Sequence, residues 1–246
     1  MAKKKGKMGT LIKDLKLETR NSKLLVLHGW STSTEKWNPF LDALEENGYN
    51  VELLKIPGLT KETDKSWTLE DYVEWLKKEA GNEKVILIGH SNGGRIALAF
   101  SAKYPEKVSC LILIDSAGIY HRDFYIRFKR LLFKSAVELG NKLAPSETLR
   151  KFIYKLAGES DYKNADPLQK QTMVNLISTD LTPILKNISV HTLIIWGEND
   201  EITPISDGKL MQSQIKNSKM EIIKGVRHSP QFTHPKEVVK IINEYL

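Results

Sequence analysis

Residues 85–100 read VILIGHSNGGRIALAF, and the fold prediction starts from them. The first four form a continuous apolar run, which is typical of a strand buried on both faces, and the last five continue as a small-residue helix that can pack closely on a sheet. Ser91 lies at the corner, with Gly89 and Gly93 two residues away on either side. Such neighbours allow a strained turn that lifts the hydroxyl above the sheet, where the helix start faces any developing charge. An ordinary glycine turn is the alternative, but the flanking strand and helix favour a nucleophilic serine.

Other apolar runs alternate with helical patterns along the chain. Strands are expected at residues 23–27, 51–56, 108–114, 192–196 and 219–223, and helices at residues 34–47, 69–80 and from 235 onward. This alternation predicts an α/β fold, with a mostly parallel sheet covered by helices on both faces. Because ligands of such sheets bind beyond the carboxyl ends of the strands, we expect residues 28–30, Ser91 and Asp115 to share one edge.

The pattern changes in residues 119–186, where no strand-like run occurs and helical spacing takes over. We interpret this stretch as a helical cap inserted into a core formed by residues 23–118 and 187–246, with residues 1–22 as a basic tail and lead-in. The first cap helix is expected to line or roof the cleft through Phe124, Phe128, Leu131 and Leu132. Its many basic residues indicate a solvated outer face, and a membrane surface or an anionic substrate is the alternative.

Composition indicates one soluble domain. The chain has 246 residues, of which 41% are hydrophobic and 27% charged, and no apolar run approaches the length of a membrane span. The net charge is +7, and four of these charges come from Lys3, Lys4, Lys5 and Lys7, so neither nucleic-acid binding nor stable membrane insertion is expected. The basic N-terminal residues are followed by a stretch in which charged residues interrupt the apolar region that a signal peptide needs. The single cysteine, Cys110, excludes a disulfide within the chain. Both observations predict a cytoplasmic location.

A serine nucleophile needs a base, and the base needs an acid that orients it. Of the six histidines, only His28, His90 and His228 lie beside predicted strand ends near Ser91. His28 and His90 adjoin strands and are expected to be structural, whereas His228 follows the last strand in a loop that can reach Ser91. After the first strand, Gly29 allows close backbone approach, so the amides that follow can point into a cavity at the sheet edge.

These features resemble the α/β-hydrolase superfamily from about residue 23 to the C-terminus. The markers are residues 28–30 (HGW), 89–94 (GHSNGG) and 196–200 (WGEND), together with Thr203-Pro204 and His228. The resemblance implies Ser91 as nucleophile, Asp200 as orienting acid and His228 as general base and then acid. It further implies an oxyanion hole formed by the backbone amides of Trp30 and Asn92. Asp115 and Glu198 are the alternative acids.

The resemblance implies no organic cofactor, and no cluster in the sequence has the spacing of metal ligands. We therefore expect a serine carboxylesterase that cleaves small-molecule esters of small to medium acyl length through an acyl-enzyme intermediate. A carbon–carbon or lactone hydrolase with the same triad is one alternative, and a non-catalytic ligand receptor is another.

Departures from related patterns narrow the choice. Many carbon–carbon hydrolases have a Gly-His-Trp run at the base histidine, whereas here His228 is followed by residues 229–232 (SPQF). They also often carry asparagine at the position of His90. Epoxide hydrolases and haloalkane dehalogenases of this superfamily carry an aspartate at the turn between this strand and helix, which we call the elbow. The serine at this position, Ser91, disfavours both activities. Asn92 adds a polar side chain near the cleft.

Overall fold

The computed structural model describes residues 22–31, 33–121 and 166–246. The lysine-rich tail lies outside the described residues, and so does the predicted cap helix with Phe124, Phe128, Leu131 and Leu132.

Six parallel strands form one sheet in the order β2-β1-β3-β4-β5-β6, which confirms the predicted α/β class. The strands are β1 (Lys23–Leu27), β2 (Val51–Leu53), β3 (Val85–His90), β4 (Val108–Ile114), β5 (His191–Gly197) and β6 (Ser218–Ile223). The chain runs from β1 outward to β2 and then returns to place β3 on the other side of β1. The strand order therefore reverses between β1 and β3, and ligand sites of open α/β sheets lie at such a switch point.

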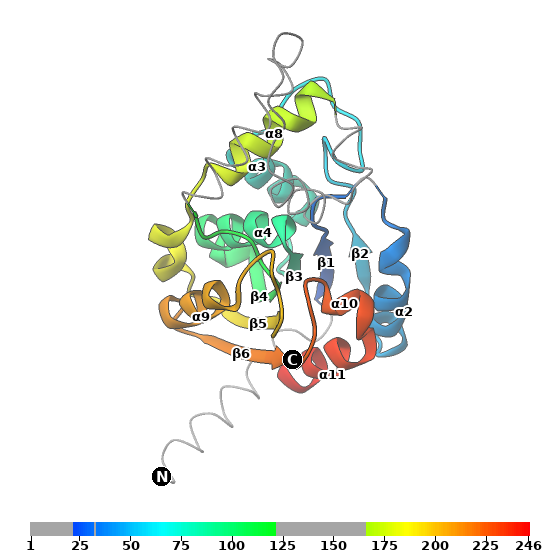
Figure 1. The fold of residues 1–246 in the computed structure, drawn as a ribbon. Helices are drawn as coiled ribbons and strands as arrows, with labels where there is room; N and C mark the ends of the chain where they lie inside the picture. Colours follow the sequence, from blue (N-terminus) through cyan, green and yellow to red (C-terminus); the bar gives the residue numbers. More distant parts are fainter. Residues whose placement is uncertain (1–21, 32, 122–165) are drawn as a thin grey trace, which may run out of the picture.

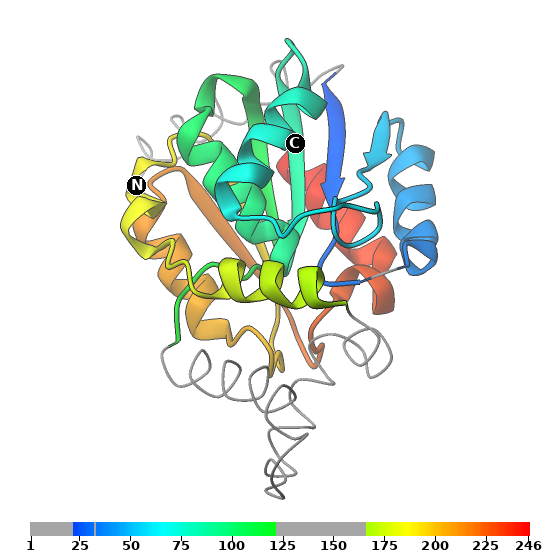
Figure 2. The same ribbon diagram turned by 90° about the horizontal axis from the view of Figure 1, so that it is seen from above.

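Helices cover both faces of the sheet (Figures 1 and 2). On one face lie α3 (Leu69–Ala80), α4 (Asn92–Lys103) and α9 (Ile205–Gln214), and on the other lie α2 (Asn38–Glu46), α10 (Pro230–Thr233) and α11 (Pro235–Tyr245). Successive strand side chains alternate between the two cores, as Leu24 and Leu25 do in β1. Burial on both faces explains why the central strands are continuously apolar.

The segment after residue 165 packs on the α4 side. It contains α8 (Pro167–Ile177) and a 3₁₀ helix (Thr182–Asn187). Asp166 caps α8 by accepting the Gln169 N–H, and Pro167 occupies the first helical turn, where no N–H partner is needed. Figure 2 shows α8 lying across the carboxyl-end side of the sheet.

Local sequence signals account for most element boundaries. α3 occupies the predicted residues because Thr68 and Asp71 form a reciprocal capping box and Gly81, at φ +65°, ends the helix. The prediction of a strand at residues 51–56 is wrong about where the strand ends. β2 stops at Leu53, because the Ile56 N–H donates to the Thr60 hydroxyl at 2.9 Å and turns the chain away.

Two helices also differ from expectation. The helix expected from residue 34 begins as a 3₁₀ turn (Glu35–Trp37) and becomes α2 only at Asn38, where the following Pro39 suits a first helical turn. α9 was not predicted, because its residues lack a regular apolar stripe. Gly208 within α9 allows the helix to lie directly on Trp196: an added Cβ would meet that ring at 2.6 Å.

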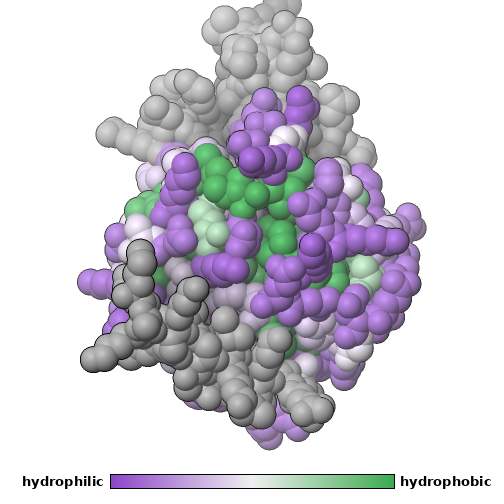
Figure 3. Space-filling model, turned by 90° about the horizontal axis from the view of Figure 1, so that it is seen from below, coloured by the Kyte–Doolittle hydropathy of each residue, from purple (hydrophilic) through white to green (hydrophobic). Residues whose placement is uncertain are grey.

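Few large apolar side chains of the described residues are exposed, and they are Leu168 and Ile222. Figure 3 shows one face, where hydrophilic residues surround a central apolar area. Within the described residues, no helix combines the length and the apolar character needed to cross a bilayer.

The elbow helix approaches β1 so closely that a side chain at Gly93 has no space. A Cβ there would lie 2.1 Å from the Leu27 carbonyl oxygen. We expect Gly93→Ala to lower the free energy of unfolding by about 3 kcal/mol or more, measured by urea denaturation. Gly48→Ala is the control, because Gly48 has φ +84° and nothing within 4 Å of an added Cβ, so it should cost only about 1–2 kcal/mol. Equal costs for the two variants would contradict the close approach.

Candidate active site

Ser91 lies in a strained turn between β3 and α4. Its backbone has φ +52° and ψ −117°, a region that residues with a Cβ rarely adopt. Neighbouring backbone groups hold this conformation: the Ser91 N–H donates to the Ile114 carbonyl at 3.1 Å, and the Ser91 carbonyl accepts the Ala117 N–H at 2.9 Å. The strain is therefore supported by the end of β4, and such strain is concentrated at functional sites.

The loop after β1 passes directly over the serine. A Cβ added to Gly29 would lie 3.1 Å from the Ser91 Cβ, so the chain reaches Trp30 in close contact with the elbow. Asn92 is the first residue of α4, and the N–H groups of a first helical turn have no partner within the helix. Trp30 and Asn92 line the same pocket as Ser91.

His228 and Asp200 form a direct pair. The His228 Nδ1 lies 2.8 Å from the Asp200 Oδ2, and because an ionised carboxylate only accepts, this nitrogen carries the hydrogen. The other Asp200 oxygen accepts the N–H groups of Ile202 at 2.7 Å and Thr203 at 3.1 Å, and the Thr203 hydroxyl donates to Oδ2 at 2.7 Å. The carboxylate is fixed, and the His228 Nε2 remains the acceptor nitrogen.

The structure brings His228 and Asp200 together, but among the described residues no hydrogen bond joins the Ser91 hydroxyl to His228. His90 adjoins both Ser91 and the His228–Asp200 pair. It is adjacent to Ser91 in the chain, and its ring centroid lies 4.8 Å from that of His228. Serine–histidine hydrogen bonds of catalytic sites are often loose until substrate binds.

The two expected structural histidines are buried. His28 contacts the Thr60 hydroxyl at 2.8 Å through Nε2, and burial lowers its pKa. Burial also holds the pKa of His90 well below its ordinary value, with the nearby His228 as the next cause. Both imidazoles are therefore neutral near pH 7.

Of the alternative acids, Glu198 does not contact His228. It is exposed, and its Oε2 accepts the Gly225 N–H at 2.9 Å. Asp115 is fully buried, and its Oδ2 lies 4.0 Å from the His228 Nδ1. Burial raises the pKa of Asp115 to about 7, while His228 opposes the rise.

One cluster in the described part of the chain has atoms close enough to share a metal ion. It contains His90, Asp115 and His228, whose nearest ligand atoms lie within 4.8 Å of one another. The sequence spacing of these residues did not indicate it. In this structure the groups are engaged with protein partners: the Ser229 hydroxyl lies 3.2 Å from the His90 Nε2, and Asp200 holds His228.

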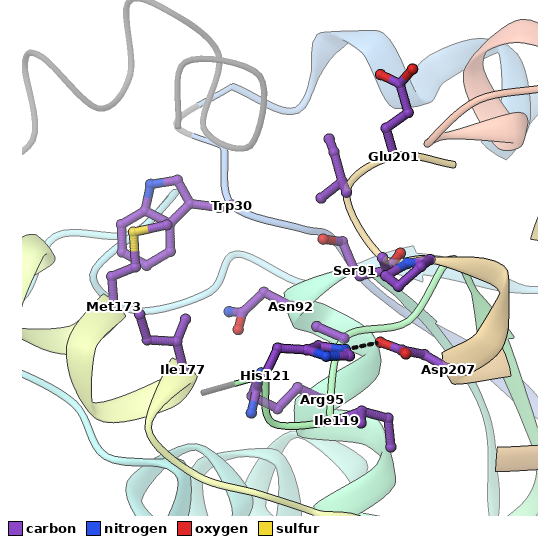
Figure 4. Close-up of a pocket in the computed structure, with 14 residues that line it drawn as sticks. Trp30, Ser91, Asn92, Arg95, Ile119, His121, Met173, Ile177, Glu201 and Asp207 are labelled. Atoms are coloured by element: carbon purple, nitrogen blue, oxygen red, sulfur yellow. Dashed lines mark hydrogen bonds and ion pairs between the residues drawn. The ribbon is translucent and has the colours of Figure 1, made fainter. Parts of the chain in front are cut away.

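A pocket of about 240 Å³ opens beside Ser91 (Figure 4). Met173 and Ile177 of α8 form part of its apolar lining, while Asn92 and Ser91 lie on the α4 side. Thr203 also lines the pocket, and its hydroxyl contacts Asp200. The His228–Asp200 pair thus lies directly behind this wall.

The sequence did not reveal Arg95 as a polar residue of the pocket. Arg95 is 4% exposed, and its Nη1 donates to the Thr179 carbonyl at 2.6 Å. Burial lowers the pKa of its guanidinium to about 10. The Arg95 Nε and the Asn92 Nδ2 are buried without a hydrogen-bond partner among the described residues. The spacing of Asn92 and Arg95, one helical turn apart, was the available signal.

A second histidine–aspartate contact lines the pocket. The His121 Nε2 lies 2.9 Å from the Asp207 Oδ2, as the dashed line in Figure 4 marks. Burial raises the pKa of Asp207, and the contact with His121 opposes that rise. These residues are 86 positions apart, so no local pattern could have paired them.

Comparisons with known proteins agree with this fold. The model of the α/β hydrolase fold family matches residues 23–135. MenH from S. aureus superposes with a TM-score of 0.73 at 23% identity, covering 93% of this chain and 94% of that one, which shows the shared fold. The chain therefore has the α/β-hydrolase fold, and nearly half of it matches the model of that family.

Three sequence relatives cover most of the chain. It is 29% identical to the 2-hydroxy-6-oxo-6-phenylhexa-2,4-dienoate hydrolase of Comamonas testosteroni, over 89% of this chain and 82% of that protein. It is 27% identical to the Homo sapiens monoacylglycerol lipase ABHD6, over 91% and 74%. It is also 27% identical to the biotin biosynthesis bifunctional protein BioHC of Teredinibacter turnerae, over 93% of this chain but only 45% of that protein. The chain thus spans less than half of the bifunctional relative.

The Thr203 hydroxyl should stabilise the Asp200 carboxylate. We expect Thr203→Val to lower the free energy of unfolding by about 1.5–3 kcal/mol at pH 7, because the lost hydrogen bond reaches a buried charged group. Thr182→Val is the matched control: its hydroxyl also donates to an aspartate, Asp180, at 2.7 Å but at a more exposed site, so its loss should be below about 1 kcal/mol. Urea denaturation of both variants measures the difference, and a Thr203→Val cost no larger than the control would contradict the assignment.

Proposed function

We propose that this protein is a serine hydrolase of carboxylic esters, with Ser91 as nucleophile, His228 as general base and acid, and Asp200 as orienting carboxylate. The observation that carries the proposal is the 2.8 Å contact between the His228 Nδ1 and the Asp200 Oδ2, close to the strained elbow of Ser91. That contact leaves Nε2 as the proton acceptor, which is the nitrogen a serine base needs.

The proposed reaction has two halves. The Ser91 Oγ attacks the ester carbonyl carbon and gives its proton to the His228 Nε2. The oxyanion is stabilised by the backbone N–H groups of Trp30 and Asn92. When the tetrahedral intermediate collapses, the C–O bond to the alcohol breaks and the alcohol leaves with the proton from His228. Water then attacks the acyl-enzyme in the same way and restores Ser91.

The preference for ester cleavage over the carbon–carbon alternative rests on this chain's own residues and pocket, because the relatives are divided between the two kinds of hydrolase. Relatives of comparable similarity include a monoacylglycerol lipase and a pimeloyl-[acyl-carrier protein] methyl ester esterase, both named for ester substrates, as well as a dienoate hydrolase. The residues that distinguish this chain from many carbon–carbon hydrolases are His90 and the run after His228. An apolar pocket of about 240 Å³ suits a small to medium acyl group.

The cap assignment for residues 119–186 is part of the same proposal. Among its described residues, α8 contributes Met173 and Ile177 to the pocket, as expected of a segment that selects the acyl chain. The buried Cys110, the one cysteine in the sequence, supports a cytoplasmic location.

A fluorophosphonate probe tests the mechanism. We expect it to label Ser91 alone, and we expect Ser91→Ala to abolish both labelling and ester hydrolysis. Asp200→Asn should lower turnover by about 10⁴-fold, because Asp200 holds the His228 tautomer. Mass spectrometry locates the label, and p-nitrophenyl esters, a lactone and a vinylogous diketone measure the activity. Ester hydrolysis that survives Ser91→Ala would rule out the mechanism, and preferred cleavage of the diketone would identify the carbon–carbon alternative.

The α8 side chains should set the acyl preference. We expect Ile177→Ala to shift the preferred p-nitrophenyl ester to a longer acyl chain, because it enlarges the pocket while leaving Ser91 in place. Leu176→Ala is the matched control, because Leu176 is fully buried in the core. It should lower the melting temperature with a cost of about 2–5 kcal/mol and leave the ester profile unchanged. A shifted profile in the control, or an unchanged one in Ile177→Ala, would contradict this role for α8.

A further inference from the structure

Asp115 is a buried carboxylate that joins three segments at the carboxyl edge of the sheet. It follows β4, has φ +42° and is fully buried. Its Oδ1 accepts the N–H of Gly197, the last residue of β5, at 2.8 Å. Its Oδ2 accepts the N–H of Ser229, also at 2.8 Å. A buried carboxylate with two charge-assisted hydrogen bonds is a strong local constraint.

The Ser229 contact acts on the turn that carries His228. Ser229 has φ +85°, a left-handed conformation that costs a serine free energy unless its surroundings enforce it. The Asp115 Oδ2 holds its N–H, and the Ser229 hydroxyl lies 3.2 Å from the His90 Nε2. Ser91, Asp115 and Ser229 are the described non-glycine residues with positive φ, and all three lie around this site.

Asp115 also faces the imidazole itself. Its Oδ2 lies 4.0 Å from the His228 Nδ1, while the Asp200 Oδ2 lies 2.8 Å from the same atom. His90 of β3, which burial keeps neutral, also faces the imidazole, and the described residues of α10 contribute no ionisable side chain. His228 therefore has two carboxyl groups on its Nδ1 side.

We propose that Asp115 is a positioning residue for the reaction: it fixes the His228 turn through the Ser229 N–H and, when ionised, supplies a second negative charge that stabilises the imidazolium formed during catalysis. This inference rests on the proposed function. Burial raises the pKa of Asp115 to about 7 and so works against its ionisation, whereas the interaction with His228 lowers that pKa and favours the charged form when His228 is protonated.

The test is the pH dependence of kcat/KM for p-nitrophenyl acetate in Asp115→Asn. This isosteric variant removes the charge and one of the two acceptor positions. We expect kcat to fall by about 10- to 100-fold with KM little changed, since His228 acts in the chemical steps. The acidic limb of the pH profile, where kcat/KM rises with pH, should move to lower pH by about one unit. A negative charge favours protonated His228, so its removal allows the base to lose its proton at lower pH.

Glu198→Gln is the matched control. Glu198 supports the same β6–α10 connection through the Gly225 N–H but lies away from His228. Its acidic limb should coincide with that of the wild type. An unchanged limb in Asp115→Asn, with activity reduced only in proportion to unfolded protein, would overturn the inference. If the fluorophosphonate probe does not label the wild-type protein, that result would instead overturn the proposed function.

If Asp115→Asn does not fold, wild-type protein provides a second test. The ring ¹⁵N signals of His228, followed by NMR from pH 4 to 9, should show two inflections, because two coupled groups titrate together. Asp200→Asn should retain both inflections, since Asp115 is still present. A single-step titration in both proteins would contradict a second carboxylate that acts on His228.

Discussion

The first turn of α4 lies on the carboxyl end of β1 with no room for a side chain. Gly93 makes this contact, because its added Cβ would fall 2.1 Å from the Leu27 carbonyl oxygen. The approach sets the position of everything at the edge of the sheet. It brings Ser91 beneath the loop that contains Gly29 and Trp30, and Asn92, the first residue of the helix, lines the same pocket. The end of β4 then holds the strained serine through the Ile114 carbonyl and the Ala117 N–H.

Much of this arrangement could be predicted from the sequence, because its signals are local. Continuous apolar runs identified the parallel strands, and the glycines around Ser91 identified the elbow. The residues that could not be predicted depend on contacts distant in sequence. β2 ends early because Thr60 takes the Ile56 N–H, and His121 meets Asp207 across 86 positions. The spacing of Asp115 relative to other acids gave no indication that its carboxylate holds the N–H groups of both Gly197 and Ser229.

The buried carboxylates of Asp115 and Asp200 are tolerated at this edge because both have hydrogen-bond partners. A buried carboxylate without hydrogen bonds costs several kcal/mol, which is why Asp200 is surrounded by N–H and hydroxyl donors and Asp115 by two backbone N–H groups. The same low-dielectric surroundings strengthen the interaction of both carboxylates with His228. Burial therefore has two opposite effects here: it resists ionisation of Asp115, and it makes that charge more effective once His228 becomes protonated.

The pocket wall formed by α8 is held by different bonds from those that hold Ser91. The Trp67 N–H donates to the Thr172 hydroxyl at 2.9 Å, and the Asn175 amide donates to the Trp67 carbonyl at 3.1 Å. These contacts join α8 to the loop before α3, whereas the elbow is held by β1 and β4. The hydrogen bonds of the Ser91 backbone go to Ile114 and Ala117, and the chain after α8 meets the elbow helix through Arg95 and the Thr179 carbonyl. A side-chain change in α8 can therefore alter the shape of the pocket while the bonds that hold the nucleophile stay in place. This separation allows one superfamily scaffold to keep its serine turn while the substrate-facing wall varies.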